Sequence, residues 1–68
     1  MTFKVMYRKS QNDALRKLVI VDAPSVWDDA ETAAAVADEL YAAGLNSSKV
    51  VKIETDEIVY DARSGLWS

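Results

Sequence analysis

The sequence predicts an α+β fold in which strands and one helix follow the order ββαββ. Residues 2–9 alternate between apolar and polar side chains, which is typical of a strand. An alanine-rich stretch in the middle of the chain has helical periodicity, and a second β-rich region follows it. Because a hairpin lies on each side of the helix, we expect an antiparallel sheet of about four strands with the α-helix packed on one face. A chain of 68 residues is the size of a small domain, so residues 1–68 are expected to form a single domain.

The first hairpin is predicted over residues 2–22. Its first strand alternates so that Phe3, Val5 and Tyr7 point to one face of the sheet. The polar sequence SQND then favours a turn, because Asn and Asp side chains bond to nearby backbone groups. The run LRKLVIVDA follows, and its β-branched apolar centre, Leu18–Val21, predicts a central strand of the sheet.

The helix is predicted over residues 26–44. Pro24 ends the preceding strand, and Ser25 can cap the first free backbone amides of a helix that begins near Val26. Gly44 can adopt the left-handed conformation that ends a helix. One side of this helix is mostly alanine, which allows it to approach the sheet closely. This inner side comprises Ala30, Ala33, Ala34, Ala37, Leu40 and Tyr41, with Trp27 at its leading edge.

The second hairpin is predicted over residues 49–63. The β-rich segments KVVKIET and EIVYDA are separated by the polar sequence TDE, which favours a turn. A short tail that ends in LWS closes the chain. The two tryptophans have different expected roles: Trp27 is expected in the core, whereas Trp67 is a candidate interface anchor.

The composition excludes several kinds of chemistry. The chain has no Cys and no His, which removes disulfides, thiolate metal sites, the commonest zinc ligand and the commonest general base. We therefore expect a protein that is not an enzyme and that holds neither a cofactor nor a metal. No apolar run approaches the ~18 residues of a membrane span. The N-terminus alternates rather than forming the apolar block of a signal peptide, so we expect a cytoplasmic protein without a membrane partner.

Charge is distributed unevenly along the chain. No Lys or Arg occurs between residues 18 and 48, whereas the predicted helix carries five acidic residues. The remainder of the chain holds all eight basic residues and six acidic ones. The helix acids form the first candidate site, because they could mimic the phosphate spacing of a nucleic acid and dock on a basic protein surface. We call them the acidic set: Asp28, Asp29, Glu31, Asp38 and Glu39.

Three alternatives compete with this hypothesis. A solvated acidic face could simply keep the protein soluble. A basic sheet face could instead bind a nucleic acid, with Tyr7 and Tyr60 stacking on bases if they do not point into the core. The chain could also be a structural subunit that self-associates through a sheet edge or the Trp67 tail, so that a monomer and a small homo-oligomer both remain open. The basic residues of the nucleic-acid hypothesis are Lys4, Arg8, Lys17 and Lys52.

The segments SVWDDAETAAAVADEL and KVVKIETDEIVYDARSGLW together resemble small accessory proteins of phages and mobile elements, which pair a helix with a closing hairpin. Type I anti-CRISPR proteins are similar in size and arrangement. The resemblance implies a non-enzymatic, phage-encoded inhibitor that occupies a host nuclease complex, such as a CRISPR effector, and blocks nucleic-acid access in a bacterial cytoplasm. It rests on this arrangement and assigns no role to a particular residue.

Overall fold

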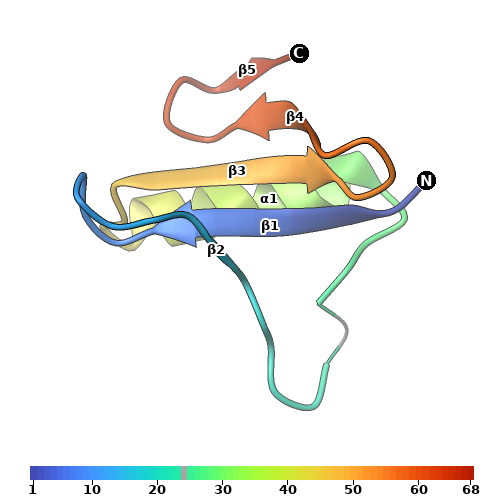
Figure 1. The fold of residues 1–68 in the computed structure, drawn as a ribbon, viewed down its shortest axis with the longest axis horizontal. Coiled ribbons are helices and arrows are strands. Elements are labelled where there is room, and N and C mark those ends of the chain that lie inside the picture. The colour runs from blue at the N-terminus through green and yellow to red at the C-terminus, as the bar shows by residue number, and fades with distance from the viewer. Residues whose placement is uncertain (24) are drawn as a thin grey trace.

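The computed structural model describes residues 1–23 and 25–68, which form one α-helix and a five-stranded antiparallel sheet. The strands lie in the order β2-β1-β3-β4-β5, and the helix packs along one face of the sheet (Figure 1). This arrangement confirms the predicted α+β class. The elements are β1 (Phe3–Arg8), β2 (Arg16–Lys17), α1 (Ala30–Ala42), β3 (Ser47–Lys52), β4 (Glu57–Asp61) and β5 (Leu66–Trp67).

Strand register decides which side chains face α1. Val5 on β1 lies opposite Val50 on β3, and Val50 lies opposite Tyr60 on β4. Residues directly opposite in an antiparallel pair share a face, so these three side chains all point toward α1. The other face, which we call the open face, is not covered by a helix in the described part of the chain. By the same register it carries Lys4, Met6, Arg8, Lys17, Lys49, Val51 and Asp61.

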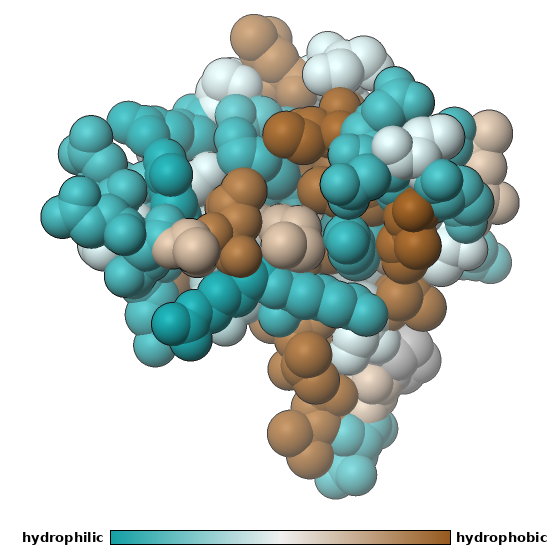
Figure 2. Space-filling model, viewed as in Figure 1, coloured by the Kyte–Doolittle hydropathy of each residue, from teal (hydrophilic) through white to brown (hydrophobic). Residues whose placement is uncertain are grey.

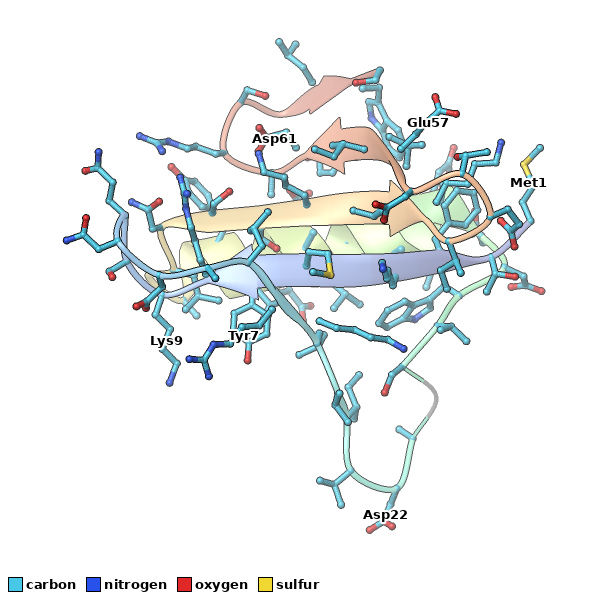
Figure 3. The ribbon with its side chains drawn as sticks, in the orientation of Figure 1. Met1, Tyr7, Lys9, Asp22, Glu57 and Asp61 are labelled. Atoms are coloured by element: carbon cyan, nitrogen blue, oxygen red, sulfur yellow. The ribbon has the colours of Figure 1, made fainter. Side chains whose placement is uncertain are left out.

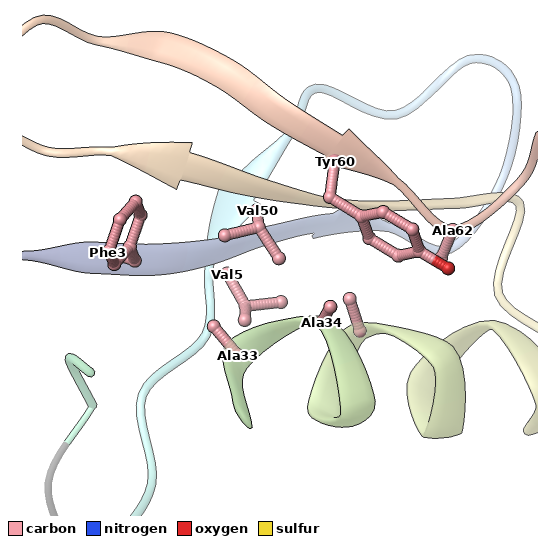
Figure 4. Packing of buried hydrophobic residues seen from close by; sticks show 8 residues of the cluster. Phe3, Val5, Ala33, Ala34, Val50, Tyr60 and Ala62 are labelled. Atoms are coloured by element: carbon pink, nitrogen blue, oxygen red, sulfur yellow. The ribbon is translucent and has the colours of Figure 1, made fainter. Parts of the chain in front are cut away.

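The core lies between α1 and the three longer strands (Figure 4). Val5, Val50, Ala33 and Ala37 are fully buried in it, and Phe3 and Tyr60 close its two ends. Small side chains also line the sheet: Ser48, fully buried opposite Tyr7, has a hydroxyl without a hydrogen-bond partner among the described residues. Alanine on the helix and valine on the sheet therefore set the close distance between the two layers.

The helix begins later than predicted. It starts at Ala30, with Asp29 as its N-cap, rather than near Val26 with Ser25 as the cap. The reason is that Trp27 is held in an extended bridge: the Phe3 amide donates to the Trp27 carbonyl at 2.7 Å, and the Trp27 amide donates to the Phe3 carbonyl at 2.9 Å. These bonds hold residue 27 outside a helix. At the other end, the helix stops at Ala42 and Gly44 adopts a φ of 105°, in the expected left-handed region.

The prediction of a central strand over Leu18–Val21 is wrong. The second strand covers Arg16–Lys17 alone, and it lies at the edge of the sheet. Because Trp27 already bonds to the backbone of Phe3, the chain after Leu18 leaves the sheet and projects as a loop (Figure 1). The predicted strand-ending role of Pro24 lies outside the described residues.

The second hairpin is present, but its bounds and its tail differ from the prediction. β3 begins at Ser47, two residues before the predicted start, and β4 ends at Asp61. No strand was predicted in the tail, yet Leu66–Trp67 pairs with Tyr60 and Asp61 as a fifth strand. A turn that contains Gly65, at a φ of 71°, returns the chain for this pairing.

Close packing at Ala37 leads to a testable prediction. Ala37→Leu should destabilise the fold by about 1–3 kcal/mol, because a larger side chain would push α1 away from the sheet. Ala35→Leu is the matched control, since Ala35 lies on the same helix and is exposed. Urea unfolding of both variants measures the difference, and equal stabilities would contradict the proposed packing.

Candidate functional site

No member of the acidic set forms an ion pair with a basic side chain of the described residues. Among the described residues, the ion pairs join Lys4 to Asp56 at 3.8 Å and Lys49 to Asp61 at 3.2 Å. Neither pair involves a member of the acidic set. Two of its residues, Asp28 and Asp29, precede α1, and the other three lie on the exposed part of the helix.

Asp29 has a structural role at the start of the helix. Its Oδ2 accepts a hydrogen bond from the Thr32 hydroxyl at 2.8 Å, and its Oδ1 accepts one from the Glu31 amide at 3.1 Å. Both bonds lower the pKa of the Asp29 carboxyl because they stabilise its charged form. The bond from Thr32 has the larger effect, and the bond from Glu31 the smaller one. The carboxylate thereby satisfies the Glu31 amide, one of the backbone groups that a helix end leaves free.

Asp38 is also engaged within the protein. The Tyr60 hydroxyl on β4 donates to Asp38 Oδ1 at 2.7 Å, and the Tyr60 ring packs on the Trp67 ring of β5 with a centroid distance of 4.6 Å. The hydrogen bond to Asp38, followed by burial and the negative charges of Asp38 and Asp61, raises the pKa of Tyr60. This contact connects α1 to the last two strands.

Asp28, Glu31 and Glu39 are the acids that remain available to a partner. All three are exposed, and their carboxylates make no hydrogen bond to another described residue. Glu31 and Glu39 lie eight residues apart on α1, which corresponds to ~12 Å along the helix axis. Only small or polar side chains, including Ala35, lie between them on that side. We call Asp28, Glu31 and Glu39 the free acids.

The basic residues of the nucleic-acid hypothesis do not form one surface. Lys4, Arg8 and Lys17 share the open face, but Lys52 lies opposite Phe3 and therefore on the α1 side. Lys4 is paired with Asp56, and Arg8 Nε donates to Asn46 Oδ1 at 2.9 Å.

The tyrosines that were considered as stacking platforms are also on the other side of the sheet. Tyr7 shares its face with Val5, and Tyr60 is buried in the core. The open face of the described strands therefore combines basic and aliphatic side chains with the acid Asp61, and it carries no aromatic ring. This arrangement lacks the stacking part of single-strand recognition.

Sequence reasoning missed two of these roles for different reasons. The Asp29 cap had a local signal, because an acid precedes a helix-forming run, but Pro24 and Ser25 gave a competing one earlier in the chain. The Tyr60–Asp38 hydrogen bond joins residues that are 22 positions apart and has no local signal. Lys49 is not among the basic residues of the nucleic-acid hypothesis, yet it also lies on the open face, where it pairs with Asp61.

The described residues hold no candidate for another kind of site. No pocket was detected in this part of the chain. No group of three or more potential metal ligands occurs within it. In the same residues, we found no helix with the length and apolar character needed to cross a membrane.

Removing the Asp29 cap should weaken the helix. Asp29→Ala is expected to lower the Tm by about 4–8 °C, because two donors lose their acceptor. Glu39→Ala is the control, since its carboxylate caps nothing, and its Tm should stay close to that of the parent. Circular dichroism melts check both variants, and an unchanged Tm for Asp29→Ala would contradict the capping role.

The Tyr60 hydroxyl should titrate above the ordinary tyrosine value of about 10. A pKa that is raised on folding stabilises the fold below the pKa of the unfolded chain, and this contribution is lost as the pH rises through the folded pKa. Ultraviolet absorbance of tyrosinate follows the titration, and Tyr60→Phe identifies the transition. Asp38→Asn should lower this pKa, because it removes the negative charge beside the hydroxyl. A Tyr60 transition at the ordinary value in the parent protein would contradict the contact.

Comparisons of the chain with protein-family models, with curated proteins and with solved structures found no match.

Proposed function

We propose that this protein is a non-enzymatic binding module that occupies a basic surface of another protein through the outer side of α1. The observation that carries the proposal is the state of the free acids, which are exposed and form no ion pair among the described residues: Asp28 precedes α1, Glu31 lies in its first turn and Glu39 lies near its C-terminal end. Lys4 and Lys49 form the ion pairs found among the described residues. Their partners are Asp56 in a turn and Asp61 on β4, not the free acids.

The helix gives these acids a fixed spacing. Ala33, Ala34 and Ala37 hold α1 against the sheet, so the opposite side of the helix presents Glu31 and Glu39 without a large movement of the backbone. A preordered surface loses less conformational entropy when it binds. The small side chain of Ala35 between the acids leaves space for long Lys or Arg side chains of a partner.

Basic surfaces of this kind are typical of proteins that bind nucleic acids. Carboxylates at a regular spacing compete there with phosphate groups, and opposite charges accelerate the first encounter. The resemblance to phage accessory proteins suggests one partner class, a bacterial nucleoprotein complex such as a CRISPR effector. That partner, and the phage origin and bacterial cytoplasm it implies, stay predictions.

Charge reversal on the helix tests the proposal. The double variant Glu31→Lys/Glu39→Lys should weaken partner binding by about tenfold or more, because it places cations against a basic surface. Its Tm should fall only slightly, since neither side chain contacts the core and the loss is limited to the favourable interaction of Glu31 with the helix N-terminus. Asp13→Lys/Glu57→Lys is the matched control: it changes the net charge equally at exposed positions outside α1. Affinity capture from bacterial lysate with mass spectrometry compares the three proteins.

If the proposal is right, the parent protein captures a nucleic-acid-binding protein, and added DNA displaces that protein. The helix variant no longer captures it. Capture that survives in the helix variant would contradict it. Direct binding of DNA by the parent protein, lost at high salt and on Lys4→Glu/Lys17→Glu, would favour the basic open face instead.

A further inference from the structure

Two groups of large apolar side chains on the surface differ in their surroundings. Val19 and Val21 lie in the loop that leaves the sheet after β2, which forms the apolar extension below the sheet in Figure 2 and has Asp22 at its tip (Figure 3). Trp67 lies on β5 and is 52% exposed. Unlike the loop, it packs on a second aromatic ring that is bonded to a carboxylate. The surroundings of Trp67 therefore indicate a particular kind of ligand.

Tyr60 connects the Trp67 ring to the helix. The two ring centroids are 4.6 Å apart, and the ring planes are tilted by 45°. The Tyr60 side chain reaches from β4 over α1 (Figure 4), where its hydroxyl donates to Asp38 Oδ1 at 2.7 Å. A half-exposed indole and an exposed carboxylate are therefore joined by a single tyrosine side chain.

Asp38 keeps one carboxylate oxygen for a partner. No hydrogen bond or ion pair between described residues engages its Oδ2. Glu31 precedes Asp38 by seven residues, which is almost two full helical turns, so both acids lie on the same flank of α1. The bond from Tyr60 shows that this flank is the one beside β4. We call Trp67, Asp38 and Glu31 the Trp67 flank.

We propose that the Trp67 flank is a recognition site for an arginine side chain of a basic partner. The guanidinium group is planar, so it stacks on the exposed indole and donates hydrogen bonds in its own plane to Asp38 Oδ2. Glu31 adds negative charge on the same flank. Lysine fits less well, because its compact ammonium group has no plane to stack. This inference rests on the proposed function, since it names the partner side chain that binds beside α1.

The Trp67 ring is held in place before a partner arrives. It packs on Tyr60, and the strand that carries it pairs with β4. Directly after it, the Ser68 amide donates to the Val59 carbonyl at 3.0 Å. A preordered ring loses less conformational entropy on binding, and tryptophan is among the residues that contribute most to interface affinity. The strand itself carries no basic residue that would repel a cation.

A peptide titration tests the site on the parent protein without its partner. The indole N–H signals of an isotope-labelled sample are followed while a capped Gly-Arg-Arg-Gly peptide is added. The Trp67 signal should shift and saturate, and a Gly-Lys-Lys-Gly peptide of equal charge should bind about threefold or more weakly. Trp27 packs against the core, so its signal is the internal control and should hardly move. No saturable shift at Trp67, or equal affinity for both peptides, would overturn the proposal.

Substitutions on the two faces of β5 provide the second test, with affinities read from the backbone amide signals of α1. Trp67→Leu should weaken binding of the arginine peptide about fivefold or more, because it removes the indole. Leu66→Ala is the matched control: it also shortens an exposed side chain of β5, but Leu66 lies opposite Asp61 and therefore on the open face. Its affinity should stay within about twofold of the parent. Equal losses in both variants would point to a loosened strand and contradict the site.

The carboxylate has its own variant. Asp38→Asn keeps an oxygen that accepts from the Tyr60 hydroxyl and removes the negative charge, so it should weaken the arginine peptide about threefold. An unchanged affinity would exclude Asp38 from the site.

The arginine site and the proposed function fail separately. If Glu31→Lys/Glu39→Lys abolishes partner capture while Trp67→Leu captures normally and the arginine peptide does not bind, the site is wrong and the proposed function stands. If the arginine peptide binds at Trp67 but the parent captures no nucleic-acid-binding protein, the proposed function is wrong and the site stands.

Discussion

The close contact between an alanine surface and a pair of valines is the constraint on which the rest of this structure depends. Ala33 and Ala37 bring α1 down onto Val5 and Val50, and a larger side chain on either layer would separate them. This contact fixes the rotation of the helix about its own axis. It therefore also fixes which residues face outward, and these are mostly acids and small side chains.

A thin core has consequences at the surface. Alanine and valine bury less apolar area than leucine or phenylalanine, so the fold relies on additional contacts at its margins. The Asp29 cap and the hydrogen bond between Tyr60 and Asp38 are two of them. Two acids that resembled a recognition surface in the sequence are thus used for stability. The charges left for recognition are fewer than a count of acidic residues suggests, and the loop after β2 leaves Val19 and Val21 exposed.

The sequence predicted the parts of the fold that local patterns determine. The alternation around Val5 and the alanines of the helix correctly identified the two surfaces that form the core, but Tyr41, predicted on the same inner side, is exposed. The path of residues 18–27 was not predictable in this way, because it depends on which segment bonds to the backbone of Phe3. Leu18–Val21 has a stronger β pattern than the segment around Trp27, yet it is Trp27 that pairs with the backbone of Phe3. Tertiary packing decides which of the two segments takes this position, and a local sequence pattern does not predict the outcome. The same holds for the contact of Tyr60 with Asp38.

The methyl groups of the core give the most direct test of the helix orientation. In an isotope-labelled sample, we expect nuclear Overhauser effects between the methyl groups of Ala33 or Ala37 and those of Val5 or Val50. The methyl group of Ala35 should show none to either valine. Contacts from Ala35 to these valines, with none from Ala37, would mean that α1 is rotated and that its acids face the sheet, which would contradict the account.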